Sequence, residues 1–171
     1  KLLAAPDPAP ALAAMQAAGI LAAILPGAEA SAMAALFHVE ALCGAPPDRL
    51  RRLALIGGED APDRLRLSKV DRRRLEALRA AATGPMPAGE LGYRLGRQDG
   101  RDALLVRCAL SGQVPSDTEL GSIVRGASAE FPVRPADLMP DYTGAALGAR
   151  LREIEARWIA SGFTLRRADL L

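Results

Sequence analysis

Apolar side chains recur along this chain at the spacing of amphipathic helices. Leu147, Leu151, Ile154 and Trp158 follow one another at intervals of four, three and four residues, which places them on one helical face. A similar face comes earlier in the chain, within residues 68–82. Both patterns predict helices that pack one side against a core.

Signals for helix starts and stops divide the chain further. Asp7 followed by Pro8 is typical of a helix start, because the carboxylate can cap the first turn and proline fits its first position. Ser68 is a second expected cap, and Ser116 with Glu119 has the form of a capping box. Glycines and prolines supply the stops. We therefore expect helices at about 8–18, 29–43, 48–56, 68–82, 102–110, 116–130 and 145–160.

Two stretches interrupt this helical pattern. Residues 85–100 contain two prolines and four glycines, which predicts a linker or a short helix and a boundary between two domains. Residues 131–144 are expected to be extended and rich in turns. We therefore divide the sequence into 1–84 and 85–171, with the boundary inside 85–100.

The composition favours helices as well. Half of the 171 residues are hydrophobic, mostly Ala and Leu, and only 4% are aromatic. Ala, Leu, Arg and Glu are strong helix formers, whereas strands favour the β-branched and aromatic residues that are sparse here. The expected fold is all-α, an irregular array of several helices without a sheet.

Two further features bear on the location of the protein. The apolar run at 9–25 is short for a membrane span and is broken by Gln16 and Pro26, so we expect neither a signal peptide nor contact with a membrane. Cys43 and Cys108 lie far apart in no CxxC pattern, which argues against a zinc site or a disulfide scaffold. Free cysteines suit a reducing compartment, so a cytoplasmic protein is expected.

Two features that could suggest catalysis have simpler structural explanations. His38 is the lone histidine, and no cysteine or carboxylate lies at a metal-ligand spacing from it. The pair Gly57-Gly58 stands beside Glu59-Asp60, but it follows a predicted helix, where glycine ends the helix and Asp60 can cap the next one. We therefore expect no catalytic residue and no metal site.

A basic cluster is the strongest candidate for function. Residues 64–79 hold seven basic side chains against two acidic ones. On a helix, Lys69, Arg72 and Arg73 lie opposite the apolar face, where they could meet nucleic-acid phosphates; a merely solvated face is the alternative. Arg74 points near the apolar side, so we expect it to extend to solvent along its stem or to pair with a buried acid.

The last predicted helix carries a second set of cations. Arg150 and Arg157 flank its apolar face together with Glu153, as an ion-pair ladder. Trp158 could stack on a nucleic-acid base, but its place in the apolar series favours the core.

Three segments carry a family resemblance. They are LLAAPDP at 2–8 with its continuation to residue 26, RLRLSK at 64–69 with its continuation to residue 75, and residues 131–159, which begin with FPV. Together they resemble the neck-to-body junction, a central segment and the tail of bacterial class II CCA-adding tRNA nucleotidyltransferases and their poly(A) polymerase relatives. The chain departs from the family at Lys69, where Asn is usual, and at Arg134-Pro135-Ala136, where a glycine-containing turn is common.

The resemblance implies a division of labour within a longer enzyme. Residues 1–84 would be the end of the neck and a body-like helical domain, and residues 85–171 a tail-like helical domain. In this family the catalytic head and neck precede the region in cis, so Mg²⁺ and CTP or ATP would bind there, and this part would bind no cofactor. It would bind and position the acceptor stem and TΨC arm of a tRNA, or another RNA, while CCA or poly(A) is added to the 3′ end.

The alternative is a helical protein-interaction or oligomerisation module that does not bind RNA. Salt-dependent binding to tRNA would tell the two apart. The residues that we expect to bind RNA are Arg64, Arg66, Lys69, Arg72, Arg73, Arg150 and Arg157.

Overall fold

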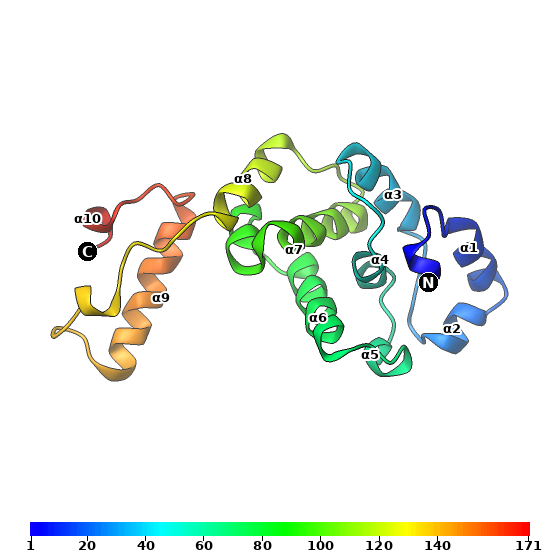
Figure 1. Cartoon of the computed structure of the whole chain (residues 1–171), viewed down its shortest axis with the longest axis horizontal. Coiled ribbons are helices and arrows are strands. Elements are labelled where there is room, and N and C mark those ends of the chain that lie inside the picture. The colour runs from blue at the N-terminus through cyan, green and yellow to red at the C-terminus, as the bar shows by residue number, and fades with distance from the viewer.

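The computed structural model describes all residues 1–171 and consists of helices and loops. Figure 1 shows an elongated, irregular array with the N-terminal helices near one end and the C-terminal helices at the other. No sheet is present, and one isolated β-bridge joins Ala28 to Gly57. The all-α prediction is confirmed. The elements are η1 (Leu2–Ala4), α1 (Ala9–Ala17), α2 (Ile20–Ile24), α3 (Met33–Leu42), α4 (Arg49–Ile56), α5 (Ala61–Arg64), α6 (Lys69–Thr83), α7 (Ala88–Ser111), α8 (Asp117–Ala127), η2 (Pro135–Asp137), α9 (Gly144–Ala160) and α10 (Arg167–Leu170).

Polar side chains cap three of the helices where the sequence predicts them, whereas Pro8 and not Asp7 occupies the cap position of α1. Asp48 accepts two backbone N–H groups at the start of α4, and Ser68 accepts one at the start of α6. Ser116 and Glu119 form both halves of the expected capping box of α8. Asp60 is different, because it lies at the start of α5 without a capping bond from its side chain. These local bonds set the entry of each helix, so the boundaries of α4, α6 and α8 follow the sequence closely.

Helix α7 corrects the expectation of a linker at 85–100. It runs through this segment as a helix that is kinked at Gly96, where φ is 79° and ψ is 174°. The nearby glycines allow close packing of helices: a Cβ on Gly92 would lie 2.1 Å from the carbonyl oxygen of Ile123, and one on Gly126 would lie 2.0 Å from that of Gly89. Several glycines therefore mark the crossing of α7 and α8 rather than a flexible connection.

Two hydrophobic clusters form the interior. The larger one joins α1, α3, α4, α6, α7 and α8, from Leu12 to Ile123. The smaller one, which we call the C-terminal cluster, extends from Val133 to Leu170 and contains Ile154 and Trp158. The expected domain boundary inside 85–100 stays a prediction, because packing alone does not define a domain.

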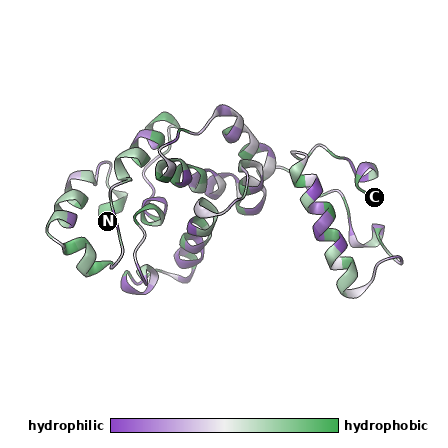
Figure 2. Ribbon diagram, turned by 180° about the vertical axis from the view of Figure 1, so that it is seen from behind, coloured by the Kyte–Doolittle hydropathy of each residue, from purple (hydrophilic) through white to green (hydrophobic).

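Helix α9 has the orientation that its apolar series predicts. Ile154 and Trp158 are buried, and Leu147 and Leu151 are partly buried against the same cluster. Figure 2 shows the polar stripe on the opposite side of this helix. The prediction that the four residues are buried together is confirmed for Ile154 and Trp158, whereas Leu147 and Leu151 are only partly buried. None of the helices combines the length and the apolar character that crossing a membrane requires.

Candidate nucleic-acid interface

The turn between α5 and α6 and the first turns of α6 expose a group of cations. Arg64, Arg66, Lys69 and Arg73 are all exposed, and none of them forms an ion pair within the chain. We call these four residues the basic surface. In sequence they belong to one short segment, and the fold leaves all four guanidinium or ammonium groups available to a partner.

Packing of α6 fixes the direction of these cations. Leu75 and Leu78 are fully buried against the larger cluster, so the opposite face of the helix points to solvent. At its start, Asp71 receives two hydrogen bonds of 2.9 Å from the guanidinium group of Arg49 on α4. Arg66 adopts a positive φ of 51°, which turns the chain just before the helix. The helix that carries Lys69 and Arg73 is therefore fixed to the core by its apolar face and to α4 by the bond between Arg49 and Asp71.

Arg72, which the sequence groups with these cations, has an acidic partner. Its guanidinium group forms an ion pair with Asp63 of α5, and the Arg72 side chain is 38% exposed. The hydrogen bond from Arg72 lowers the pKa of Asp63. A neutralised arginine releases fewer counterions on meeting a phosphate, so Arg72 is a weaker candidate than its unpaired neighbours.

The two candidates on α9 lie apart from the basic surface. Helix α9 is at one end of the molecule, well separated from α5 and the start of α6 (Figure 1). Arg150 pairs with Glu153 at 2.9 Å and stands over the ring of Tyr142. Arg157 donates a long hydrogen bond of 3.5 Å to the carbonyl oxygen of Asp169. The fold thus brings four of the seven expected residues together as free cations and gives the others intrachain partners.

Arg74 pairs with buried and half-buried acids, as one of the two sequence alternatives expected. Its guanidinium group donates to Asp99 at 2.7 Å, to Asp48 at 2.9 Å and to Asp102 at 2.6 Å. Burial would lower the pKa of Arg74, but the bonds to Asp99 and Asp48 outweigh it and raise that pKa. Arg74 is therefore part of the support and not of the exposed surface.

Sequence reasoning missed the fully buried part of this charge network, which Asp102 connects to Arg74. Arg51 donates to Glu40 at 2.7 Å and to Asp102 at 2.7 Å, and all three side chains are shielded from solvent. Arg52 beside it donates to the other oxygen of Glu40 and to backbone oxygens of Leu3, Ala5 and Pro6. The sequence offered one signal for the burial of these two side chains: Arg51 and Arg52 lie between Leu50 and Leu53 in a helix that is otherwise mostly apolar.

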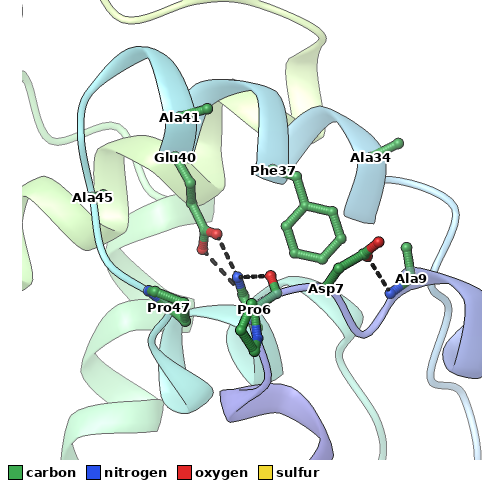
Figure 3. A pocket seen from close by; sticks show the side chains of 10 residues that line it. Pro6, Asp7, Ala9, Ala34, Phe37, Glu40, Ala41, Ala45 and Pro47 are labelled. Atoms are coloured by element: carbon green, nitrogen blue, oxygen red, sulfur yellow. Dashed lines mark hydrogen bonds and ion pairs between the residues drawn. The ribbon is translucent and has the colours of Figure 1, made fainter.

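The network borders the largest pocket of the molecule, of about 540 Å³. Figure 3 shows Glu40 and Phe37 of α3 facing Pro6 and Asp7 of the N-terminal segment across it. The Glu40 carboxylate is bound by Arg52, and Asp7 accepts the backbone N–H of Ala9. The charged groups at this pocket are therefore already held in place by bonds within the chain.

His38 lies outside the basic surface. It is exposed on α3, and no three His, Cys, Asp or Glu side chains gather at a position that could hold a metal ion. The candidate site is an exposed cationic surface that can bind anions. Comparison with known proteins adds nothing to this description: no family model, no curated protein and no solved structure matches the chain.

Proposed function

We propose that this chain binds RNA through the basic surface and acts as the non-catalytic C-terminal region of a tRNA nucleotidyltransferase, which adds CCA or poly(A) to RNA 3′ ends. The observation that carries the RNA part is the set of four exposed cations without intrachain partners on one rigid support. Like charges held near one another repel, and phosphates relieve that repulsion while they release counterions.

The arrangement suits RNA recognised by shape. Base edges are hidden in the deep major groove of an A-form helix, so proteins contact such a stem mainly through its phosphates and 2′-hydroxyl groups. The basic surface offers three arginines and one lysine and no exposed aromatic side chain on which a base could stack. The acceptor stem and TΨC arm of a tRNA are therefore the ligand that we propose. The family assignment itself rests on the three sequence segments at 2–26, 64–75 and 131–159.

A salt series tests the RNA part. Replacing Arg64, Lys69 and Arg73 by Ala should lower the slope of log affinity against log salt by roughly two to three, if each cation neutralises one phosphate. tRNA binding by the chain and this triple variant is measured across the series. The free energy of unfolding should change by no more than about 0.5 kcal/mol per site, as for other surface substitutions.

A matched control removes the same charge elsewhere. Arg134, Arg152 and Arg166 are exposed and form no ion pair, and all three belong to the C-terminal part of the chain. Their triple Ala variant should keep the slope of the unchanged protein. Equal slopes for all three proteins would refute the proposed interface, and a loss confined to the control would move it to the C-terminal helices. Self-association without tRNA binding would support the protein-interaction module instead.

Two observations test the enzyme part separately. The coding sequence upstream of Lys1 is expected to contain a Gly-Gly-x-Val-Arg-Asp stretch and an Asp-x-Asp pair, because the head domain of this family has a glycine-rich strand and helix and two metal-binding aspartates. The 171-residue chain itself should incorporate no labelled CTP or ATP in the presence of Mg²⁺. An upstream sequence without these motifs would remove the nucleotidyltransferase assignment and leave RNA binding standing.

A further inference from the structure

A small pocket beside the kink of α7 contains two arginines and no acid. It has a volume of about 240 Å³ and is lined by Arg97 and Arg101 of α7 and by Leu120, Ile123 and Val124 of α8. Pockets for drug-sized ligands usually measure about 300–1,000 Å³, so this one suits a smaller molecule or a single group of a larger one. It lies between α7 and α8, whereas the basic surface lies in the turn between α5 and α6 and at the start of α6.

The two arginines are not neutralised within the chain. Arg97 is exposed and makes no hydrogen bond or ion pair, and Arg101 donates only to the carbonyl oxygen of Cys43. They are four residues apart on one helix, where like charges repel by a few tenths of a kcal/mol. The nearest acids on α7 face the other way, since Asp99 and Asp102 are bound by Arg74.

The kink adds a further positive contribution at the same place. Gly96 interrupts the helical backbone, so the second part of α7 begins at Arg97 and continues to Ser111. The amino end of a helix carries a partial positive charge and favours anions. Two guanidinium groups without an acidic partner therefore line one pocket close to a helix start, and the other wall of the pocket is apolar.

We infer that this pocket binds a phosphate group attached to a small apolar or aromatic moiety. The guanidinium groups of Arg97 and Arg101 hold the phosphate, since two arginines match its oxygens with charge-assisted hydrogen bonds. The attached moiety lies on Leu120 and Val124, the latter 41% exposed. The phosphate can come from a free organic phosphate or from one nucleotide of a bound RNA. The inference rests on the pocket alone and does not require the proposed function.

Phenyl phosphate is the probe that tests both halves of the pocket. NMR titration of the full chain should give saturable shifts at Arg97, Arg101 and Val124. Arg97→Gln should weaken binding at least about tenfold, because it removes one charge-assisted bond to the phosphate; a factor of ten corresponds to about 1.4 kcal/mol. This substitution breaks no hydrogen bond or ion pair within the chain, so the fold is expected to persist. Val124→Ser should weaken phenyl phosphate but leave inorganic phosphate binding unchanged.

Arg152→Gln is the matched control, because Arg152 is exposed and unpaired on α9. It should bind phenyl phosphate like the unchanged chain. Absence of saturable binding, or equal binding by Arg97→Gln and the unchanged chain, would overturn the inference. If Arg97→Gln also weakens tRNA binding, the phosphate belongs to the RNA; if tRNA binding is unchanged, a free organic phosphate is the ligand. Either result supports the pocket, and neither depends on the outcome at the basic surface.

Discussion

Arg51 and Arg52 stand next to each other on α4, and both guanidinium groups are buried. Arg51 connects α3 to α7 through Glu40 and Asp102, whereas Arg52 binds the backbone of the N-terminal segment. Burying a charge is costly unless every polar atom finds a partner, and here the carboxylates and carbonyl oxygens supply those partners. The two residues therefore join four separate segments of the chain around one polar centre.

Removing Arg51 should strongly destabilise the protein. Arg51→Met keeps the apolar stem but removes one positive charge from the buried network. Glu40 then keeps only Arg52, and Asp102 keeps only Arg74 and Gln98, so the free energy of unfolding should fall by about 3–5 kcal/mol. Urea denaturation followed by circular dichroism measures the loss. Arg64→Met, at an exposed and unpaired arginine, is the control and should change it by about 0.5 kcal/mol or less. Equal stabilities for the two variants would contradict the role of the network.

Trp158 is the centre of the C-terminal cluster. Its ring lies 5.5 Å from Tyr93, 5.4 Å from Phe131 and 5.0 Å from Phe163, measured between ring centroids. Trp158→Ala should lower the free energy of unfolding by about 3–5 kcal/mol, as other aromatic truncations in cores do. Trp158→Phe retains a ring and should cost less. A loss below about 1 kcal/mol for Trp158→Ala would show that the cluster contributes little to the cooperative fold.

At the scale of elements, the crossing of α7 and α8 depends on glycine. A Cβ on Gly126 would stand 2.0 Å from the backbone oxygen of Gly89, closer than any van der Waals contact. Gly126→Ala must push the helices apart and should cost at least the 1–3 kcal/mol typical of overpacked cores. Gly121 lies on the same helix, and its nearest neighbour would be the end of the Arg125 side chain at 3.6 Å.

Gly121→Ala is consequently the internal control. Alanine is the better helix former by about 1 kcal/mol, so this variant should be as stable as the unchanged chain or more stable. Thermal unfolding of both variants separates the two effects, because they make the same chemical change on one helix. If both variants lose stability equally, the close approach of the helices is not what requires Gly126.

At the scale of the whole molecule, ion pairs between elements make stability depend on pH. Burial would raise the pKa of Asp48, but hydrogen bonds from the Arg51 backbone and from Arg74 outweigh it and lower that pKa. Burial would likewise raise the pKa of Glu155, but hydrogen bonds from Arg94 and Tyr93 outweigh it and lower that pKa. A carboxylate with a lowered folded-state pKa binds fewer protons in the folded than in the unfolded chain. Each carboxylate therefore contributes fully to the free energy of unfolding above its ordinary pKa, which is 3.8 for Asp48 and 4.5 for Glu155. This contribution is lost as the pH falls through the lowered pKa of the folded protein.

The melting temperature should accordingly fall as the pH is lowered below about 4.5. Glu155→Gln removes one of the titrating groups that join α9 to α7, so its melting temperature should be lower at neutral pH and should fall less steeply in acid. Melting curves between neutral pH and strong acid test this. A decline of equal steepness in both proteins would show that the Glu155 bonds do not couple the two elements.

The sequence by itself determined the all-α fold and the starts of α1, α4, α6, α8 and α9, whereas α2, α5, α10 and the first half of α7 were not predicted. Capping side chains such as Ser68 and Ser116 act within one turn, and apolar spacing defines the buried face of α9, so both signals are local. The exposure of Lys69 and Arg73 was also predictable, because a helical face opposite an apolar series must point to solvent. Local patterns of this kind need no knowledge of distant residues.

Only the tertiary structure decided what distant residues do to one another. Asp102 is 51 residues from Arg51 in the chain, and their bond explains why two charged residues lie inside the core. The glycines of 85–100 looked like a linker because glycine weakens isolated helices, yet α8 packs so closely on Gly92 that a side chain would not fit there. The roles of Arg72 and Arg97 also could not be predicted from local patterns. Asp63 neutralises Arg72, whereas Arg97 has no acidic partner and lies beside a pocket that forms only when α8 packs on α7.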